Sequence, residues 1–423
     1  GLASSASNAL GTYNGWVDST YIGPNGTLLM NVTNADVGLY EWLTLDGQGY
    51  QGGGVFQAYS GTGTVRAYYL RGQINVLSDA VFNLRNGSNI YLNNGGGETY
   101  GSANIIKIGN GDFRFYSNES NFTGSYINAS GSVRVYDAGR IMGMASMRLE
   151  RNSFFGLNND STSADETRSR LGDDMPIYTD GYVRMRQEAT AGVFSGIEKL
   201  GTANVLGGQL GIEADMGATL SGGVPVLKGE YVGFHFTEIV RNPGTSVHLR
   251  LLDPGTSFAD KNFNAAVPSN SNGNIFVVQV DVLPTLIGTG DGSNGNAAIA
   301  PGFFAGVRPN WYNAAGTGSI FSEDYISGRL VTVDTNSAGD HFLRPLLDSE
   351  YKVVGSPDTA QTTTIRLEDQ GISADQNLKI VGVTSDSLGG SEFTVRQDSL
   401  LTLGSVAADC ALPSGINLVV NSL

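Results

Sequence analysis

The strongest constraint on the fold is a short strand pattern that occurs four times along the chain. The segments GQINVLSDAVFNL (residues 72–84) and GQLGIEADMGATL (208–220) share Gly, Gln, two apolar residues two positions apart, Asp at the eighth place and Leu at the thirteenth. The segment SEFTVRQDSLLTL (391–403) keeps the apolar pair, the Asp and the Leu, and GSVRVYDAGRI (131–141) has one residue fewer before its Asp. Apolar residues that alternate with a period of two predict β-strands with one buried face.

Each copy predicts a strand, a corner marked by Asp, and a second strand. An Asp at such a corner can accept hydrogen bonds from backbone N–H groups two residues on and so close the turn. The alternative is a row of carboxylates that binds cations or transfers protons. The residues of this structural repeat are Gly72, Asp79, Gly131, Asp137, Gly208, Asp215 and Asp398. The side chains expected to point inward are those of Ile74, Val76, Val133, Val135, Leu210, Ile212, Phe393 and Val395, and those expected to point outward are Asn75, Arg134, Gly211 and Thr394.

The fold class follows from what one copy cannot do alone. A single strand pair cannot bury its own apolar face, whereas copies stacked at the ~4.8 Å strand spacing form a continuous core. The 59 glycines among 423 residues, with only 15% charged residues, are typical of a turn-rich β-protein. We therefore expect an all-β, parallel β-solenoid that runs as one continuous segment over residues 1–423. Residues 152–179 are expected to form an exposed insertion, and residues 253–274 and 288–318 to form long loops.

Charge and hydropathy bear on the classes of partner. The net charge is −15, and the basic residues are scattered singly, so nucleic acid is not an expected partner. No apolar run approaches the 18 residues expected of a membrane-spanning helix. The chain has one cysteine, Cys410, which rules out an internal disulfide framework and leaves a buried thiol or a reactive one as its two interpretations.

Three groups of residues could carry chemistry or binding, and each has a plainer interpretation. The stretch DGSNGN places oxygen donors at alternate positions, as calcium loops do, but lacks the bidentate carboxylate and also reads as a flexible turn. Four acidic residues form the densest patch of carboxylates. Two of them could act as the carboxylate pair of a glycosidase. Alternatively, they lie in an exposed insertion, where water solvates them. Tryptophans could stack on sugars or pack in the core. These candidates are Asp291, Ser293, Asn294 and Asn296 for calcium; Asp165, Glu166, Asp173 and Asp174 for hydrolysis; and Trp16, Trp42 and Trp311 for sugars.

Two stretches carry a family resemblance. IKIGNGDFRFYSNESNFTGSYINASGSVRVYDAG resembles the autotransporter-associated β-strand repeat in its strand ending at Lys, its Gly-rich turn, its Asn-Phe-Thr-Gly step and its Ser-Gly before the next strand. AAIAPGFFAGVRPNWYNAAGTGSIFSEDY is similar to a segment that recurs inside large bacterial passenger proteins of this kind. The matching residues are Lys107, Gly109, Gly111, Asn121, Phe122, Thr123, Gly124, Gly131, Pro301, Trp311, Tyr312 and Tyr325.

The resemblance implies a right-handed parallel β-helix, secreted or exposed on a bacterial surface, cut from a longer polypeptide or completed by a neighbouring subunit. Its motifs specify architecture and imply no catalytic residues. No cofactor is expected, and calcium is the one ion that could bind. The first hypothesis is thus a structural protein that acts by self-association end to end, by contact with other surface proteins or by adhesion to glycans. The second is a β-helix polysaccharide lyase or hydrolase.

Overall fold

The computed structural model describes most of the chain in two compact units. Unit 1 comprises residues 1–247, 255–257 and 264–282, and unit 2 comprises residues 248–254, 258–263 and 283–423. The expected single continuous segment over residues 1–423 stays a prediction. The described residues are 19–32, 36–60, 65–85, 87–92, 97–116, 119, 121–137, 139–159, 169–187, 196–216, 219–221, 224–226, 231–252, 256–263, 274–288, 290–293, 295–307, 326–355, 377–381, 392–395, 400–403 and 417–420.

Unit 1 is built from long parallel sheets. The first sheet contains, in order, β1 (Ser19–Ile22), β4 (Trp42–Leu45), β7 (Ile74–Val76) and β10 (Thr99–Tyr100). The second contains β2 (Leu28–Val32), β5 (Phe56–Ser60), β8 (Ala80–Arg85), β11 (Ile105–Ile108), β13 (Ser125–Asn128), β15 (Ser146–Leu149), β17 (Ile177–Thr179), β20 (Ala203–Val205) and β25 (Ile239–Arg241).

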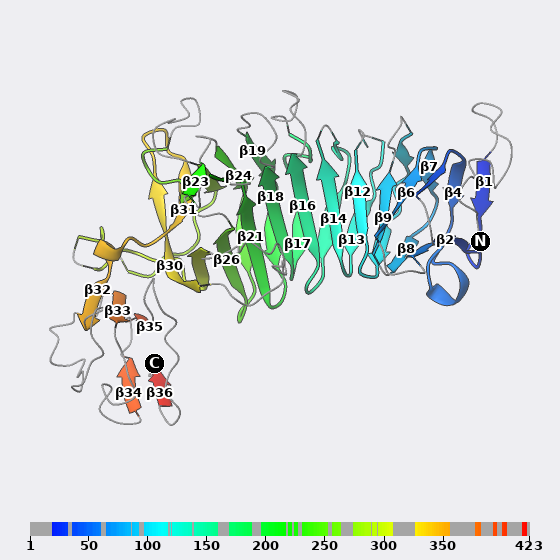
Figure 1. Ribbon diagram of the computed structural model, residues 1–423. Coiled ribbons are helices and arrows are strands. Elements are labelled where there is room, and N and C mark those ends of the chain that lie inside the picture. Colours follow the sequence, from blue (N-terminus) through cyan, green and yellow to red (C-terminus); the bar gives the residue numbers. More distant parts are fainter. Residues whose placement is uncertain are drawn as a thin grey trace. The chain divides into compact units, whose positions relative to one another are not determined.

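The third sheet of unit 1 carries the longest strands, several of which lie side by side in Figure 1. It contains β3 (Val37–Leu39), β6 (Arg66–Leu70), β9 (Ser88–Leu92), β12 (Asp112–Phe115), β14 (Ser132–Tyr136), β16 (Phe154–Asn159), β18 (Tyr182–Gln187) and β21 (Gln209–Asp215). A further parallel group consists of β19 (Gly196–Leu200), β24 (Tyr231–Phe236) and β28 (Ile275–Val280). The hairpin β22 (Thr219–Ser221) and β23 (Val224–Val226) is antiparallel.

The chain visits the three sheets in turn. From β1 to β12, each strand belongs to the sheet after that of the strand before it, and every third strand returns to the same sheet. Paired strands are therefore separated by one circuit of the chain, which spans 20 residues between Phe113 and Val133, 36 between Ala203 and Ile239, and 44 between Tyr231 and Ile275. The part of the chain described here contains no α-helix, so the expected all-β class with parallel pairing is confirmed.

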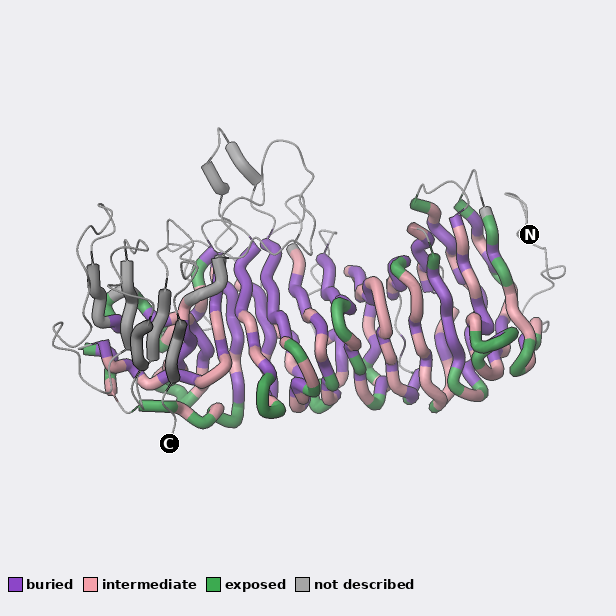
Figure 2. The backbone as a smooth tube through the Cα atoms, turned by 90° about the horizontal axis from the view of Figure 1, so that it is seen from below, coloured by how far each residue is buried: buried purple, intermediate pink, exposed green. Residues whose placement is uncertain are grey.

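Side chains that point between the sheets form the core. Figure 2 shows buried residues in purple along the strands. Every described residue of the expected inward set is buried, namely Ile74, Val76, Val133, Val135, Leu210 and Ile212. Aromatic rings fill much of the space, as where Phe82 meets Phe113 edge to face at 5.2 Å between ring centroids. Asn75 and Arg134 are half-buried. Gly211 lies between the inward residues Leu210 and Ile212 and so faces outward as expected, although the ring of its register partner Tyr182 packs over it and buries it. Phe393, Thr394 and Val395 belong to β34, whose side chains are outside the described set.

The four copies of the sequence repeat do not occupy equivalent places. Gly72 precedes β7 of the first sheet, whereas Gly131 and Gly208 precede β14 and β21 of the third. Gly72 is required by close packing, since a Cβ there would lie 2.0 Å from the carbonyl oxygen of Glu41. Gly131 and Gly208 instead adopt positive φ angles of 71° and 48°, which favour glycine. The common pattern thus marks the start of a strand, not one position in the circuit.

The expected insertion and loops are corrected in part. Within residues 152–179, β16 and β17 are paired strands with buried residues at both ends of the segment, because they continue the third and second sheets. Residues 160–168 lie outside the described set. Residues 253–274 include the short strand β27 (Ser257–Phe258), and residues 288–318 include β29 (Phe303–Val307).

Unit 2 mixes antiparallel and parallel pairing. β29, β30 (Ile326–Thr335) and β31 (His341–Pro345) pair antiparallel, which the sequence analysis did not expect. The strand β26 (Ser246–Leu251) belongs to this unit from residue 248 on. Five further strands pair parallel. These strands are β32 (Lys352–Gly355), β33 (Asn377–Val381) and β35 (Leu400–Leu403) in one sheet, and β34 (Glu392–Val395) and β36 (Asn417–Val420) in another. A small core is formed by Ala297, Ile299, Leu330, Leu346 and Tyr351.

Candidate functional site

The most ordered group of side chains outside the core is a row of four tyrosines along the third sheet. Tyr69 on β6, Tyr91 on β9, Tyr116 after β12 and Tyr136 on β14 come from four consecutive strands of that sheet. Their ring centroids are 4.7, 5.5 and 4.8 Å apart in that order, and the last two pairs are stacked with interplanar angles of 15° and 8°. We call this row the tyrosine ladder.

Arginines run beside the tyrosine ladder. Arg114 donates a hydrogen bond from Nη1 to the Tyr91 hydroxyl oxygen at 2.7 Å, and its guanidinium lies about 5 Å from the ring centroids of both Tyr91 and Tyr136. Its Nε also pairs with Asp112 at 2.6 Å, and Arg134 lies 3.5 Å from the same carboxylate. Each ring of the ladder packs against at least one other ring, and guanidinium groups lie near Tyr69, Tyr91 and Tyr136. These contacts occupy much of the ring surface on which a sugar would stack.

Burial sets the protonation state of these phenols. It raises the pKa values of Tyr91, Tyr116 and Tyr136, so that all three stay protonated at neutral pH. Arg114 opposes this effect at all three rings, though burial outweighs it.

The same outward face continues into a buried ion pair. Arg184 on β18 donates from Nε and Nη2 to one carboxylate oxygen of Glu213 on β21, at 2.9 and 2.6 Å. The guanidinium also lies 4.8 Å from the centroid of the Phe154 ring. Both side chains are almost fully buried, which makes the pair sensitive to loss of either member.

A lysine occupies the corner between the second and third sheets. Lys107 on β11 is fully buried, and its ammonium group donates to the backbone carbonyls of Gly109, at 2.9 Å, and Ser130. Burial lowers the pKa of Lys107 to about 7, with Asp112 opposing the shift. Because one carbonyl belongs to its own turn and the other to the turn one circuit later, Lys107 ties two turns together.

A buried carboxylate plays a comparable part elsewhere in unit 1. One side-chain oxygen of Glu198 accepts hydrogen bonds from the backbone N–H groups of Arg170 and Leu171, at 2.8 and 2.7 Å. Burial raises the pKa of Glu198 to about 7, while Arg170 and these two hydrogen bonds act in the opposite direction. A carboxyl group with a raised pKa can act as a general acid. In Glu198, however, the oxygen already accepts hydrogen bonds from two backbone N–H groups.

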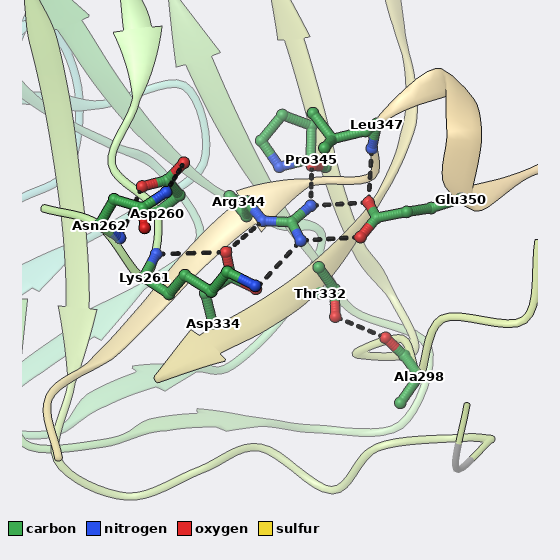
Figure 3. A network of polar contacts seen from close by, with 10 residues as sticks. All are labelled: Asp260, Lys261, Asn262, Ala298, Thr332, Asp334, Arg344, Pro345, Leu347 and Glu350. Atoms are coloured by element: carbon green, nitrogen blue, oxygen red, sulfur yellow. Dashed lines mark hydrogen bonds and ion pairs between the residues drawn. The ribbon is translucent and has the colours of Figure 1, made fainter. Parts of the chain in front are cut away.

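Unit 2 has its own polar cluster, drawn in Figure 3. Arg344 on β31 reaches Asp334 on β30 through Nε and Nη2, at 2.7 and 3.0 Å, and Glu350 through Nη1 and Nη2, at 2.7 and 2.8 Å. The Leu347 N–H donates to the same Glu350 carboxylate at 2.6 Å. Two carboxylates raise the pKa of Arg344 despite its burial, and Arg344 lowers the pKa of Glu350. The arrangement joins a strand pair to the turn that follows it.

The repeat aspartates do not form a row. Asp79 accepts hydrogen bonds from the backbone N–H and the side-chain amide of Asn104, at 2.9 and 3.2 Å, so it ties its corner to the next circuit instead of closing its own turn as expected. Asp137 has a positive φ of 49° at the end of β14, and Asp215 ends β21 with its carboxylate 3.5 Å from Arg186. Asp398 lies outside the described residues.

The candidates for calcium, hydrolysis and sugar binding are scattered or only partly described. Asp291 accepts a hydrogen bond from the Ser293 N–H at 2.9 Å, which is typical of a turn. Hydrogen bonds from the Ser293 hydroxyl and from its N–H lower the Asp291 pKa. Asp173 and Asp174 are exposed, and Ser169 donates to Asp173. Asn296 and Trp42 are half-buried. Asn294, Asp165, Glu166, Trp16, Trp311 and Cys410 lie outside the described set.

Metal-binding clusters and membrane-spanning helices are both absent from the residues that the structure describes. These residues hold no group of three or more His, Cys, Asp or Glu side chains placed to bind a metal ion. They include no helix with the length and apolar character to cross a membrane.

Sequence reasoning missed the tyrosine ladder. The signal in the sequence is that the four tyrosines follow one another at 22, 25 and 20 residues, which are lengths of one circuit. Comparison of the chain with family models, curated proteins and solved structures found no match.

Proposed function

We propose that this chain is a structural β-solenoid protein of a bacterial surface or filament, a right-handed parallel β-helix that acts by shape, self-association and adhesion. The observation that carries the proposal is the repeated visit to three parallel sheets with inward apolar residues in register. Such stacking satisfies the backbone and builds a continuous core circuit by circuit.

The polar ladders support the same proposal. Asp79 contacts Asn104, Lys107 contacts Ser130, and Arg114 contacts Tyr91, each one circuit away. Side chains engaged in this way position neighbouring circuits. This use of polar groups is what a protein built for shape needs.

The resemblance to the autotransporter-associated repeat adds the compartment. In the resembling stretch, the Gly-rich turn falls between β11 and β12, and the Ser-Gly step falls between β13 and β14. These are the places that the repeat would give them. From the resemblance we propose secretion or surface exposure, end-to-end or surface-protein partners, and glycans as adhesion targets. Neither nucleic acid nor a cofactor has a part in the proposal.

Surface labelling tests the proposed compartment. An antibody raised against the purified chain should bind intact cells of the source bacterium, and brief protease treatment of those cells should remove the signal. Detection only after the cells are lysed would overturn surface exposure. Sedimentation of the purified chain over a range of concentrations tests self-association, which predicts species larger than the monomer.

A further inference from the structure

The four phenols of the tyrosine ladder are spaced as two close pairs. Tyr69 and Tyr91 are 4.7 Å apart between centroids, Tyr116 and Tyr136 are 4.8 Å apart, and the gap between the pairs is 5.5 Å. Tyr69, Tyr91 and Tyr116 are half-buried, so solvent reaches each pair. Tyr69 and Tyr91 are register partners on β6 and β9, and Tyr116 and Tyr136 directly follow the register partners Phe115 and Val135 of β12 and β14.

We propose that the tyrosine ladder is a site of oxidative cross-linking, in which dityrosine bonds join Tyr69 to Tyr91 and Tyr116 to Tyr136. The co-reactant is a peroxide acting through a peroxidase that removes one electron at a time. The proposal does not depend on the proposed function, because it concerns only the geometry of these rings.

The chemistry balances with that oxidant. Each phenol of a pair loses one electron to the peroxidase and one proton to water, which gives two phenoxyl radicals. A carbon–carbon bond then forms between the two ring carbons ortho to the hydroxyl groups, and the ortho hydrogens move to the oxygens as aromaticity returns. The pair loses two hydrogen atoms in all, and one peroxide is reduced to two waters.

Held geometry favours coupling within a pair. Two radicals fixed on neighbouring strands meet without diffusion, so the effective concentration of one for the other is high. Stacked rings also pass an electron readily, and a radical formed at the accessible Tyr116 can therefore reach the buried Tyr136. The cationic Arg114 beside Tyr91 accepts no proton, so the proton leaves to water.

The dityrosine bonds would link successive circuits covalently. Tyr116 and Tyr136 close a loop of about 20 residues, and a covalent bond across such a loop restricts the unfolded chain as a disulfide does. Oxidised protein should therefore unfold at a higher denaturant concentration than untreated protein.

The test treats the dilute purified chain with a haem peroxidase and hydrogen peroxide and maps the peptides by mass spectrometry. The expected products are two cross-linked peptides, each lighter than the sum of its parts by two hydrogen atoms. Tyr116→Phe keeps the ring in the stack and removes the phenol, so it should abolish the second link and leave the first. Tyr69→Phe should do the reverse.

Tyr178→Phe, on β17 of the second sheet, serves as the matched control and should leave both links unchanged. The proposal is overturned if neither link forms, if all links join separate molecules, or if the links persist at the same yield in Tyr116→Phe and Tyr69→Phe.

Discussion

Lys107 and Asn128 are register partners on β11 and β13, and both buried side chains donate hydrogen bonds to backbone carbonyls of the turns beside them. Lys107 reaches Gly109 and Ser130, and Asn128 donates from Nδ2 to Gly131 and Phe154, at 3.2 and 3.1 Å. Two neighbouring strands therefore end in the same way, each with one polar side chain that links its own turn to the next circuit.

The lysine of this corner makes stability rise with pH. The folded chain releases the Lys107 proton above about pH 7, whereas the unfolded chain keeps it to about 10.5. Between these values the unfolded state binds more protons, so the free energy of unfolding should rise by up to about 1.4 kcal/mol per pH unit. Lys107→Met should remove this slope in urea unfolding measured from pH 7 to 10, and Lys199→Met controls for the lost charge. Parallel profiles for wild type and Lys107→Met would contradict the prediction.

Glu198 should act in the opposite direction at lower pH. Its folded pKa of about 7 lies above the ordinary value of 4.5, so between these values the folded state holds the extra proton. Stability is then highest below pH 4.5 and falls by up to about 1.4 kcal/mol per pH unit as pH rises to 7. Glu198→Gln keeps an oxygen for the Arg170 and Leu171 N–H groups and should flatten this profile. Glu238→Gln is the charge control, and a slope shared by both variants would exclude Glu198 as its source.

Two glycines with positive φ separate backbone strain from crowding. Gly131 has φ 71°, and a Cβ there would lie 2.6 Å from the Lys107 ammonium nitrogen and 2.7 Å from the Gly111 carbonyl oxygen. Gly244 has φ 80° with nothing within 4 Å of an added Cβ. Gly244→Ala should cost about 1 kcal/mol from backbone strain alone. Gly131→Ala should cost about 1–3 kcal/mol more because of the collision. Urea unfolding measures both, and equal losses would show that the corner can relax.

Two arginine–carboxylate pairs of similar length should differ in energy. Arg344→Met leaves the buried Glu350 and the half-buried Asp334 without their cation and should destabilise unit 2 by about 3–5 kcal/mol. Arg148→Met breaks a 2.6 Å pair with Glu150, but those side chains are 50% and 40% exposed, so the loss should be about 0–1 kcal/mol. Peptide-resolved hydrogen exchange in β31 and β15 reports each site separately. If adding Glu350→Gln to Arg344→Met does not reduce the loss, uncompensated charge is not its cause.

The strands could be predicted from sequence because their signal is local. Apolar residues at Ile74 and Val76, or at Val133 and Val135, alternate within three positions, and a period of two is enough to define a buried face. Which of the three sheets a strand joins is not a local property. The segments that begin at Gly72 and Gly131 therefore look alike in sequence and lie on different sheets.

The tyrosine ladder and the Lys107 corner depend on contacts one circuit away. A circuit has no fixed length, so no single sequence period aligns Tyr91 with Tyr116 or Lys107 with Ser130. Burial of Lys107 also could not be anticipated, since a lysine at a strand end is ordinarily exposed. The close approach of Gly131 to the ammonium group of Lys107 is visible only in three dimensions.

The variable circuit length bears on how such a chain can evolve. Paired strands are 20 residues apart at Phe113 and Val133 and 36 apart at Ala203 and Ile239, yet both pairs are parallel and their inward residues buried. The extra residues of the longer circuit include the hairpin β22–β23, which pairs with neither the first, the second nor the third sheet. Insertions and deletions at such places change the outline of the surface and leave the core stack intact. The turns of this protein can therefore change rapidly in evolution, while core residues such as Phe82 and Phe113 remain constrained. For the same reason, foreign peptides inserted into the turns should be tolerated.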